Sequence, residues 1–176
     1  LIEAAKLLSG DKTATVVFYG DSNYNKLTLD NVKFTVSKVT PTINVTVADV
    51  TYPSKAVAVI NISNMANGTV KVNLTVPGTT WSKVIDGTVS NGQAIVDLTG
   101  LSGGNYDVKV EFISSDDYNK DATVFTKFTV LPNNSLINIS MTKKTYAVGE
   151  EIEIKFEVIN SSGDLKILID GVYYNT

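Results

Sequence analysis

Four oxygen-bearing side chains lie close together in the stretch FISSDDYNKD, residues 112–121. The candidate metal ligands are Asp116, Asp117, Asn119 and Asp121. Carboxylate and amide oxygens are what Ca²⁺ prefers, but it takes about six to eight of them, and this spacing is not that of an EF-hand. The alternative is a structural turn in which Asp and Asn side chains hydrogen-bond the backbone and Tyr118 closes the end of the core. We expect the turn and no cofactor, with calcium as the alternative.

A second copy of this stretch, FYGDSNYNK, occupies residues 18–26. Aligned on Phe18 and Phe112, the two copies share the Tyr-Asn-Lys that ends the shorter one. Asp21 has no acidic neighbour, whereas Asp116 and Asp117 are adjacent. A calcium site would keep its charge from copy to copy, so the repeat favours the structural turn.

The composition removes most routes to catalysis. The sequence has no His, no Cys and no Arg, so the commonest general base, the thiol nucleophile and the usual zinc ligands are missing. We therefore expect a protein that is not an enzyme. The net charge of −3 gives no basic surface for nucleic acid. No apolar run approaches the roughly 20 residues of a membrane-spanning helix, so no membrane-spanning segment is expected.

Two further features are candidates for carbohydrate chemistry. Seven asparagines stand in Asn-x-Ser/Thr sequences and are candidate glycosylation sites: Asn44, Asn61, Asn67, Asn73, Asn133, Asn138 and Asn160. A chain rich in Asn and Thr also produces such sequences by chance. Trp81 is the single tryptophan. An exposed Trp ring can stack on a sugar, although an aromatic side chain that covers the core is the more common arrangement.

These residues must be positioned by a repeated scaffold, because most of the sequence aligns with itself at an offset of 94 positions. Phe18 aligns with Phe112, and VKFTV at 32–36 aligns with TKFTV at 126–130. After Asn67-Gly68 the alignment slips by one, so that GTVKVNL pairs with GDLKILI. We expect residues 1–37 to be the second half of one unit, 38–131 a complete unit, and 132–176 the first half of another.

Inside the unit, apolar and polar residues alternate with a period of two, which is typical of strands with one buried face. The pattern predicts strands near 42–48, 56–63, 69–76, 80–85, 93–98, 106–113 and 123–130. Tight turns are expected at Pro77-Gly78, Asn91-Gly92 and Asp170-Gly171. We expect Val72, Leu74, Val108, Val110 and Phe128 to be buried, and Lys71, Asn73, Lys109 and Lys127 to be exposed. Seven short strands in about 90 residues favour an all-β fold, namely tandem immunoglobulin-like antiparallel β-sandwiches.

The motifs of the complete unit resemble those of a known family. Leu101, Gly104 and Tyr106 are followed by Asp117 and Tyr118, and then by Phe128 and Val130. This order is similar to the bacterial-type Ig-like repeats of adhesin-like cell-surface proteins of methanogenic archaea. The first half-unit departs from the motif, because Lys12 stands where Tyr106 stands. The resemblance implies an extracellular, cell-surface location and a stalk or adhesive role.

We therefore expect a non-catalytic structural or adhesive protein, a stalk or filament of tandem Ig-like repeats involved in cell adhesion. Surface glycans or proteins are potential partners. Two alternatives stay open: a carbohydrate-binding module that uses Trp81, and an accessory domain attached to a larger surface enzyme.

The two half-units lead to a prediction about partners. Neither half buries its own core, but one supplies the strands that the other lacks. We expect the C-terminal half of one copy to meet the N-terminal half of the next, head to tail. Ile152, Ile154 and Phe156 would then contact Ala14 and Phe18 of a neighbouring chain. In the alternative, a longer polypeptide once joined the two halves covalently.

Overall fold

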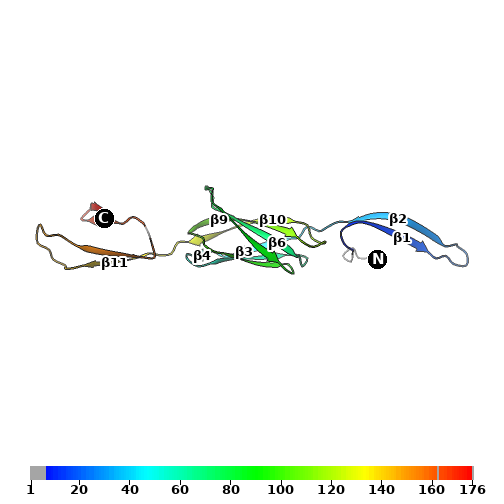
Figure 1. The fold of residues 1–176 in the computed structure, drawn as a ribbon, viewed down its shortest axis with the longest axis horizontal. Helices are drawn as coiled ribbons and strands as arrows, with labels where there is room; N and C mark the ends of the chain where they lie inside the picture. Colours follow the sequence, from blue (N-terminus) through cyan, green and yellow to red (C-terminus); the bar gives the residue numbers. More distant parts are fainter. Residues whose placement is uncertain (1–6, 162, 176) are drawn as a thin grey trace. The chain divides into compact units, whose positions relative to one another are not determined.

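A computed structural model describes residues 7–161 and 163–175. Every regular element in this part of the chain is a β-strand, from β1 to β14 (Figure 1). The all-β fold predicted from the alternating pattern is therefore confirmed. The chain divides into two compact units, residues 1–132 and 133–176, and each unit is described by itself.

Across the described ranges, no helix of the length and apolar character needed to cross a membrane is present.

The middle of the chain forms two sheets. The first is three-stranded, in the order β3 (Ile43–Val47), β5 (Ala56–Ile62) and β8 (Gln93–Leu98). The second is five-stranded, in the order β4 (Val50–Thr51), β10 (Ala122–Leu131), β9 (Gly104–Ser114), β6 (Gly68–Thr75) and β7 (Ser82–Val89). Neighbouring strands are antiparallel, except that β4 runs parallel to β10. Because β4 has only two residues, it is too short to show a period, and the sequence pattern did not reveal it.

One apolar core lies between these two sheets, and its members come from both of them. The core positions predicted from the alternation, Val72, Leu74, Val108, Val110 and Phe128, are all buried. On the polar phase, Lys71 and Lys127 are exposed, as predicted.

The prediction of exposure is wrong for Asn73 and Lys109, which are half-buried. They lie opposite each other in the β6–β9 ladder, in the interior of the five-stranded sheet. Side chains of the neighbouring strands therefore reduce the solvent exposure of both residues, although both lie on the solvent face of the sheet.

Six of the seven predicted strand positions lie within about two residues of the observed bounds, and the remaining strand is displaced. The pattern placed that strand at 80–85, whereas β7 runs from Ser82 to Val89. Asn91 and Gly92, both with positive φ, form the two-residue turn between β7 and β8. The hydrophobic alternation in β7 is weak, because Asp86 and Gly87 interrupt it, and this hides the end of the strand.

The chain before the sandwich contains one antiparallel hairpin, formed by β1 (Gly10–Phe18) and β2 (Leu27–Val36). The register changes between Ala14 and Val16, where β2 contains one extra residue. Asn31, with a φ of 61°, lies in this bulge. Residues 1–4, which the offset of 94 aligns with the end of the strand predicted at 93–98, lie outside the described residues.

In unit 133–176, the described residues form two separate two-stranded sheets. β11 (Leu136–Met141) pairs with β12 (Ile154–Ile159), and β13 (Lys166–Ile169) pairs with β14 (Val172–Asn175). The β13–β14 turn is Asp170-Gly171, and both residues have positive φ, as expected for an Asp-Gly hairpin turn.

Candidate interaction surfaces

The loop between β9 and β10, which carries the four calcium candidates, is held together from within. Asp116 Oδ1 accepts hydrogen bonds from the backbone N–H groups of Tyr118 at 2.9 Å and Asn119 at 2.7 Å. Its Oδ2 accepts one from the backbone N–H of Asn67 at 3.0 Å. Asn119 Nδ2 donates to both oxygens, at 3.2 and 3.1 Å. The carboxylate thus has protein donors on both oxygens.

These donors also set the charge of Asp116. Burial by itself would raise the pKa of this carboxyl group. The N–H groups of Asn67, Asn119 and Tyr118 outweigh that effect, and they hold the pKa well below the ordinary value for aspartate. Asp116 is therefore ionised throughout the neutral range, and its charge stabilises the loop.

The other calcium candidates do not converge with Asp116 on one point. Asp121 Oδ1 accepts the backbone N–H of Ser114 at 2.8 Å, and Asn119 Oδ1 accepts Asn64 Nδ2 at 3.3 Å. Asp117 is exposed to solvent. Among the described residues, no group of three or more His, Cys, Asp or Glu side chains is arranged to hold a metal ion. The hydrogen bonds give these oxygens a structural role within the turn.

The same loop holds the segment that leads into the sandwich. Lys38 Nζ donates to the carbonyl of Asp116 at 2.6 Å. The Val39 N–H donates to the Tyr118 carbonyl, and the Lys120 N–H donates to the Val39 carbonyl, both at 2.8 Å. The loop therefore fixes the backbone of the entering chain.

The expectation that Tyr118 closes the core is wrong. Tyr118 is 42% exposed, whereas Asn119 beside it is 1% exposed. Asn119 fills the buried position because Asp116 accepts its N–H groups and Asn64 donates to its oxygen. A polar side chain can be buried there because its hydrogen bonds are satisfied.

The hydrogen bonds also correct the alignment of the two loop copies. In the first copy, Asp21 Oδ1 accepts the backbone N–H groups of Asn23 at 2.8 Å and Tyr24 at 2.9 Å. Asp21 thus plays the part of Asp116, at an offset of 95 rather than 94. Tyr24 is then equivalent to Asn119, and the shared Tyr-Asn-Lys letters do not mark equivalent positions.

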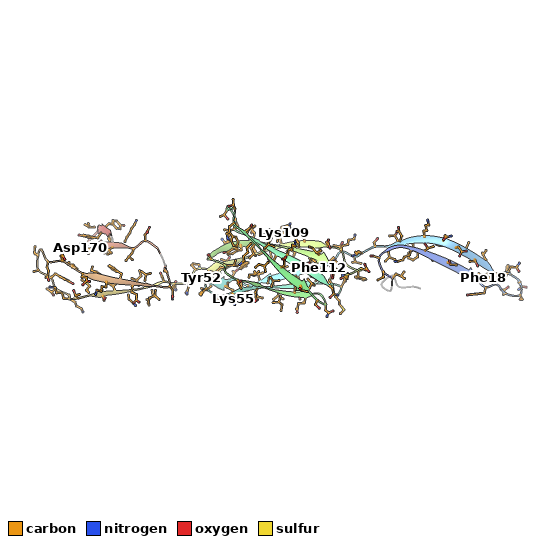
Figure 2. The ribbon with its side chains drawn as sticks, viewed as in Figure 1. Phe18, Tyr52, Lys55, Lys109, Phe112 and Asp170 are labelled. Carbon is orange, nitrogen blue, oxygen red and sulfur yellow. The ribbon has the colours of Figure 1, made fainter. Side chains whose placement is uncertain are left out.

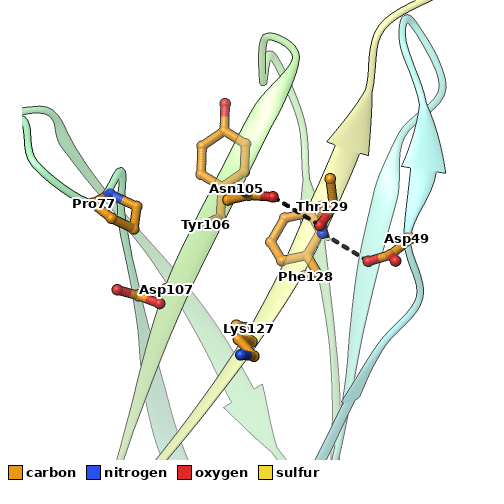
Figure 3. Close-up of a pocket in the computed structure, with 8 residues that line it drawn as sticks. All are labelled: Asp49, Pro77, Asn105, Tyr106, Asp107, Lys127, Phe128 and Thr129. Atoms are coloured by element: carbon orange, nitrogen blue, oxygen red, sulfur yellow. Dashed lines mark hydrogen bonds between the residues drawn. The ribbon is translucent and has the colours of Figure 1, made fainter.

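A depression of about 460 Å³ lies near the opposite end of β9 and β10. Its lining is Asp49, Pro77, Asn105, Tyr106, Asp107, Lys127, Phe128 and Thr129 (Figure 3). Two of the polar groups already have partners: the Thr129 N–H donates to Asp49 at 2.7 Å, and Thr129 Oγ1 donates to Asn105 Oδ1 at 3.0 Å.

A matching depression occurs on β1 and β2, lined by Asp11, Lys12, Thr13, Lys33, Phe34 and Thr35. The Thr35–Asp11 hydrogen bond, at 2.8 Å, repeats the Thr129–Asn105 bond. The shape therefore recurs although side chains differ between the copies, which indicates that it follows from the strand pair itself.

Trp81 packs against the core. Its ring meets Tyr106 edge to face, with 5.5 Å between centroids, and Tyr106 stacks on Phe128 at 5.4 Å. The Trp81 residue is still 39% exposed. This packing supports the interpretation that Trp81 covers the core, and Trp81 itself is not among the residues that line the depression beside Tyr106 and Phe128.

The seven candidate glycosylation sites differ in their surroundings. Six of the asparagines are exposed: Asn44, Asn61, Asn67, Asn133, Asn138 and Asn160. Asn73 is half-buried, and its Oδ1 is buried without a hydrogen-bond partner. Asn67 Nδ2 donates to the Met65 carbonyl at 3.2 Å, and its Oδ1 accepts the Asn91 N–H at 3.1 Å. A glycan on Asn67 would disturb these bonds, so the exposed Asn44 is the better candidate.

The β1–β2 hairpin has an exposed apolar face. The face consists of Val16, Phe18, Leu27, Leu29, Val32 and Phe34, each between 42% and 57% exposed. Cross-strand pairing places Val16 beside Leu29 and Phe18 beside Leu27. A monomeric protein rarely leaves such a continuous apolar surface in water. We call it the hairpin face.

Unit 133–176 has a second apolar surface. It is a groove of about 440 Å³ lined by Ile152, Ile154, Phe156, Ile167, Ile169 and Tyr174. Phe156 lies opposite Ile139 in the β11–β12 pair, and Ile167 lies opposite Tyr174 in the β13–β14 pair. The groove therefore lies between two small sheets, and we call it the C-terminal groove. The predicted contact between this groove and Ala14 and Phe18 involves a neighbouring chain, and it stays a prediction.

A scan against protein-family models and a search of curated proteins found no match to this chain.

Proposed function

We propose that this protein is a non-catalytic segment of an extracellular stalk or fibre, built from tandem Ig-like sandwiches that join head to tail. Three features support this: the strand order of the central sandwich, the recurrence of its strand pairs at both ends, and the two uncovered apolar surfaces. The cell-surface location and the adhesive role rest on the motifs that resemble archaeal adhesin repeats.

The strand order of the central sandwich supports an Ig-like topology. Sheet β3-β5-β8 corresponds to strands A, B and E, and β7-β6-β9-β10 corresponds to C′, C, F and G. Tyr106, near the start of β9, donates its hydroxyl to the Ser102 carbonyl at 2.8 Å. This is the position and hydrogen bond of the tyrosine corner of Ig-like domains. In the hairpin, Lys12 Nζ donates to the Ser9 carbonyl at 3.4 Å instead.

Strand registers support the tandem repeat. In β1–β2, Gly10 lies opposite Val36, and in β9–β10 Gly104 lies opposite Val130, each shifted by 94. In β3–β5, Val45 lies opposite Ile60. In β11–β12, Ile139 lies opposite Phe156. Ile139 is thus shifted by 94 positions from Val45, and Phe156 by 96 positions from Ile60. The hairpin thus corresponds to strands F and G, and β11 to β14 correspond to strands A, B, C and C′.

The two uncovered apolar surfaces carry the proposal, because each corresponds to a part of the central core that the other lacks. Phe112 and Phe128 are 1% and 3% exposed, whereas their equivalents Phe18 and Phe34 are 50% and 42% exposed. Ile60, the equivalent of Phe156, is fully buried. A C-terminal groove and a hairpin face from two copies would restore one sandwich core. A contact between different surfaces does not close on itself, so it extends into a fibre.

The test is self-association of the 176-residue chain. We expect light scattering to show mass that rises with concentration, and electron microscopy to show linear strings. Phe18→Asp on the hairpin face, or Phe156→Asp in the groove, should abolish this growth. Phe125→Asp is the matched control, because Phe125 is 72% exposed on the outer face of the central sandwich. A chain that stays monomeric at all concentrations, or growth that the control also abolishes, would overturn the proposal.

A further inference from the structure

We infer that strand β1 of one copy pairs edge to edge with strand β13 of the next, antiparallel, with Val16 opposite Ile167 and Ala14 opposite Ile169. This inference rests on the proposed head-to-tail assembly and defines its geometry. It assigns a specific partner to two strand edges, in addition to the contact between the apolar surfaces.

The central sandwich contains the template for this pairing. There, β6 pairs with β9, with Val72 opposite Val110 and Leu74 opposite Val108. Strand β1 corresponds to β9 at an offset of 94, so Val110 becomes Val16 and Val108 becomes Ala14.

Strand β13 corresponds to β6 by sequence and by pairing. GDLKILI at 163–169 aligns with GTVKVNL at 68–74, so Ile167 replaces Val72 and Ile169 replaces Leu74. Each strand also forms an antiparallel hairpin with the strand that follows it, β14 or β7. Transferring the β6–β9 register onto these equivalents gives the pairs stated above.

Both edges are available for pairing. Within the described residues, β1 pairs only with β2, and β13 pairs only with β14. Each strand therefore has one edge of backbone N–H and C=O groups that no other strand in the sheet uses, and such edges add strands from other chains. The extra residue of the bulge is in β2, so β1 itself keeps a regular edge.

Side chains select this register over its neighbours. A slip of one residue would turn the apolar residues of β1 away from the core, because side chains alternate between faces. A slip of two in one direction would place Lys12 opposite Ile169, and would bring an ammonium group against the apolar groove. A slip of two in the other direction would place Phe18 opposite Ile167 and leave Ala14 opposite Gly171, at the turn.

Engineered disulfides test the register, because the chain has no cysteine of its own. Thr15 and Leu168 are direct neighbours on the outer face in the inferred pairing, as Lys109 and Asn73 are in the central sandwich. Oxidised Thr15→Cys/Leu168→Cys protein should give a ladder of linked copies on a non-reducing gel. Two shifted variants are the controls, Thr13→Cys/Leu168→Cys and Val17→Cys/Leu168→Cys. They should give about tenfold less linked product, because a disulfide needs Cβ atoms about 3.5–4.5 Å apart.

Light scattering on the same reduced samples separates the two hypotheses. Assembly together with a ladder from the Thr15/Leu168 variant supports both. Assembly without that ladder, or with a stronger ladder from a shifted variant, overturns the inferred register and leaves the proposed function standing. If only the cysteine variants fail to assemble, their substitutions have disrupted the strand edge. The conservative variant Thr15→Ser/Leu168→Val should then assemble if the register holds. Failure of that variant to assemble overturns the register. An unmodified chain that does not assemble overturns both.

Discussion

The central sandwich and the β1–β2 hairpin contain strands with the same alternation of apolar and polar residues, yet their apolar faces are buried to very different extents. Phe112 is 1% exposed inside the sandwich, and Phe18 of β1, which aligns with Phe112 in the sequence, is 50% exposed (Figure 2). The same alternation of apolar and polar residues is present in both strands. The difference is that a second sheet faces Phe112, whereas none of the described residues forms such a sheet over Phe18. Local pattern therefore determines which face is apolar, and the opposite sheet determines whether it is buried.

The largest effect should come from truncating the two equivalent phenylalanines. Phe112→Ala should reduce the free energy of unfolding of the central sandwich by about 3–5 kcal/mol, because it leaves a cavity in a packed core. Phe18→Ala should leave that free energy nearly unchanged at concentrations where the chain is monomeric. Chemical denaturation of both variants measures the difference. Equal losses would mean that Phe18 is already buried in the single chain.

The next effect concerns the two loop aspartates. Asp116→Asn should cost about 1–3 kcal/mol of unfolding free energy, because a charged acceptor of several N–H groups is lost. Asp21→Asn should cost much less, since Asp21 lies on an exposed hairpin and accepts two backbone N–H groups. Thermal unfolding of the two variants provides the comparison.

Acid should lower the stability of the fold by protonating the Asp116 carboxylate. The folded-state pKa of Asp116 is lowered, so its contribution is fully present above the ordinary aspartate pKa of about 3.9 and is lost as the pH falls further toward the folded value. Wild-type stability should therefore decline below about pH 4, and Asp116→Asn should show a shallower decline. An identical pH profile for both proteins would show that Asp116 is not responsible.

A further comparison concerns two neighbouring residues of β6. Leu74→Ala should cost about 2–5 kcal/mol, because Leu74 is fully buried in the core. Asn73→Ala should be neutral or slightly stabilising, since the Asn73 Oδ1 is buried without a hydrogen-bond partner. Urea denaturation tests the pair, and a large loss for Asn73→Ala would reveal a partner for its amide.

The smallest expected change is the response to chelation. If the loops at 20–26 and 115–121 are structural turns, excess EDTA should not alter the melting temperature. Calcium added afterwards should also have no effect. A fall of several degrees that calcium reverses would restore calcium as the stabilising ligand of Asp116 and its neighbours.

Strand phase and turn chemistry could be predicted well because both are local. Val72, Leu74 and Val110 alternate with polar residues, and the Asn-Gly and Asp-Gly pairs supply the positive φ of tight hairpin turns. The alignment of the β1–β2 loop with the β9–β10 loop was harder to predict. Identical letters aligned Tyr24 with Tyr118, but the carboxylate hydrogen bonds align Tyr24 with Asn119. A bulge and a loop of different length compensate each other, and a self-comparison at one offset does not detect that.

The sequence by itself determined the β-strands, the apolar side of each strand and the repetition of the pattern, since side-chain alternation is a property of the backbone. Only the tertiary structure decided that Asn119 rather than Tyr118 is buried, because that choice depends on donors and acceptors supplied by Asp116 and Asn64. It also decided which apolar faces are covered, because covering a face requires a second sheet that is distant in the sequence.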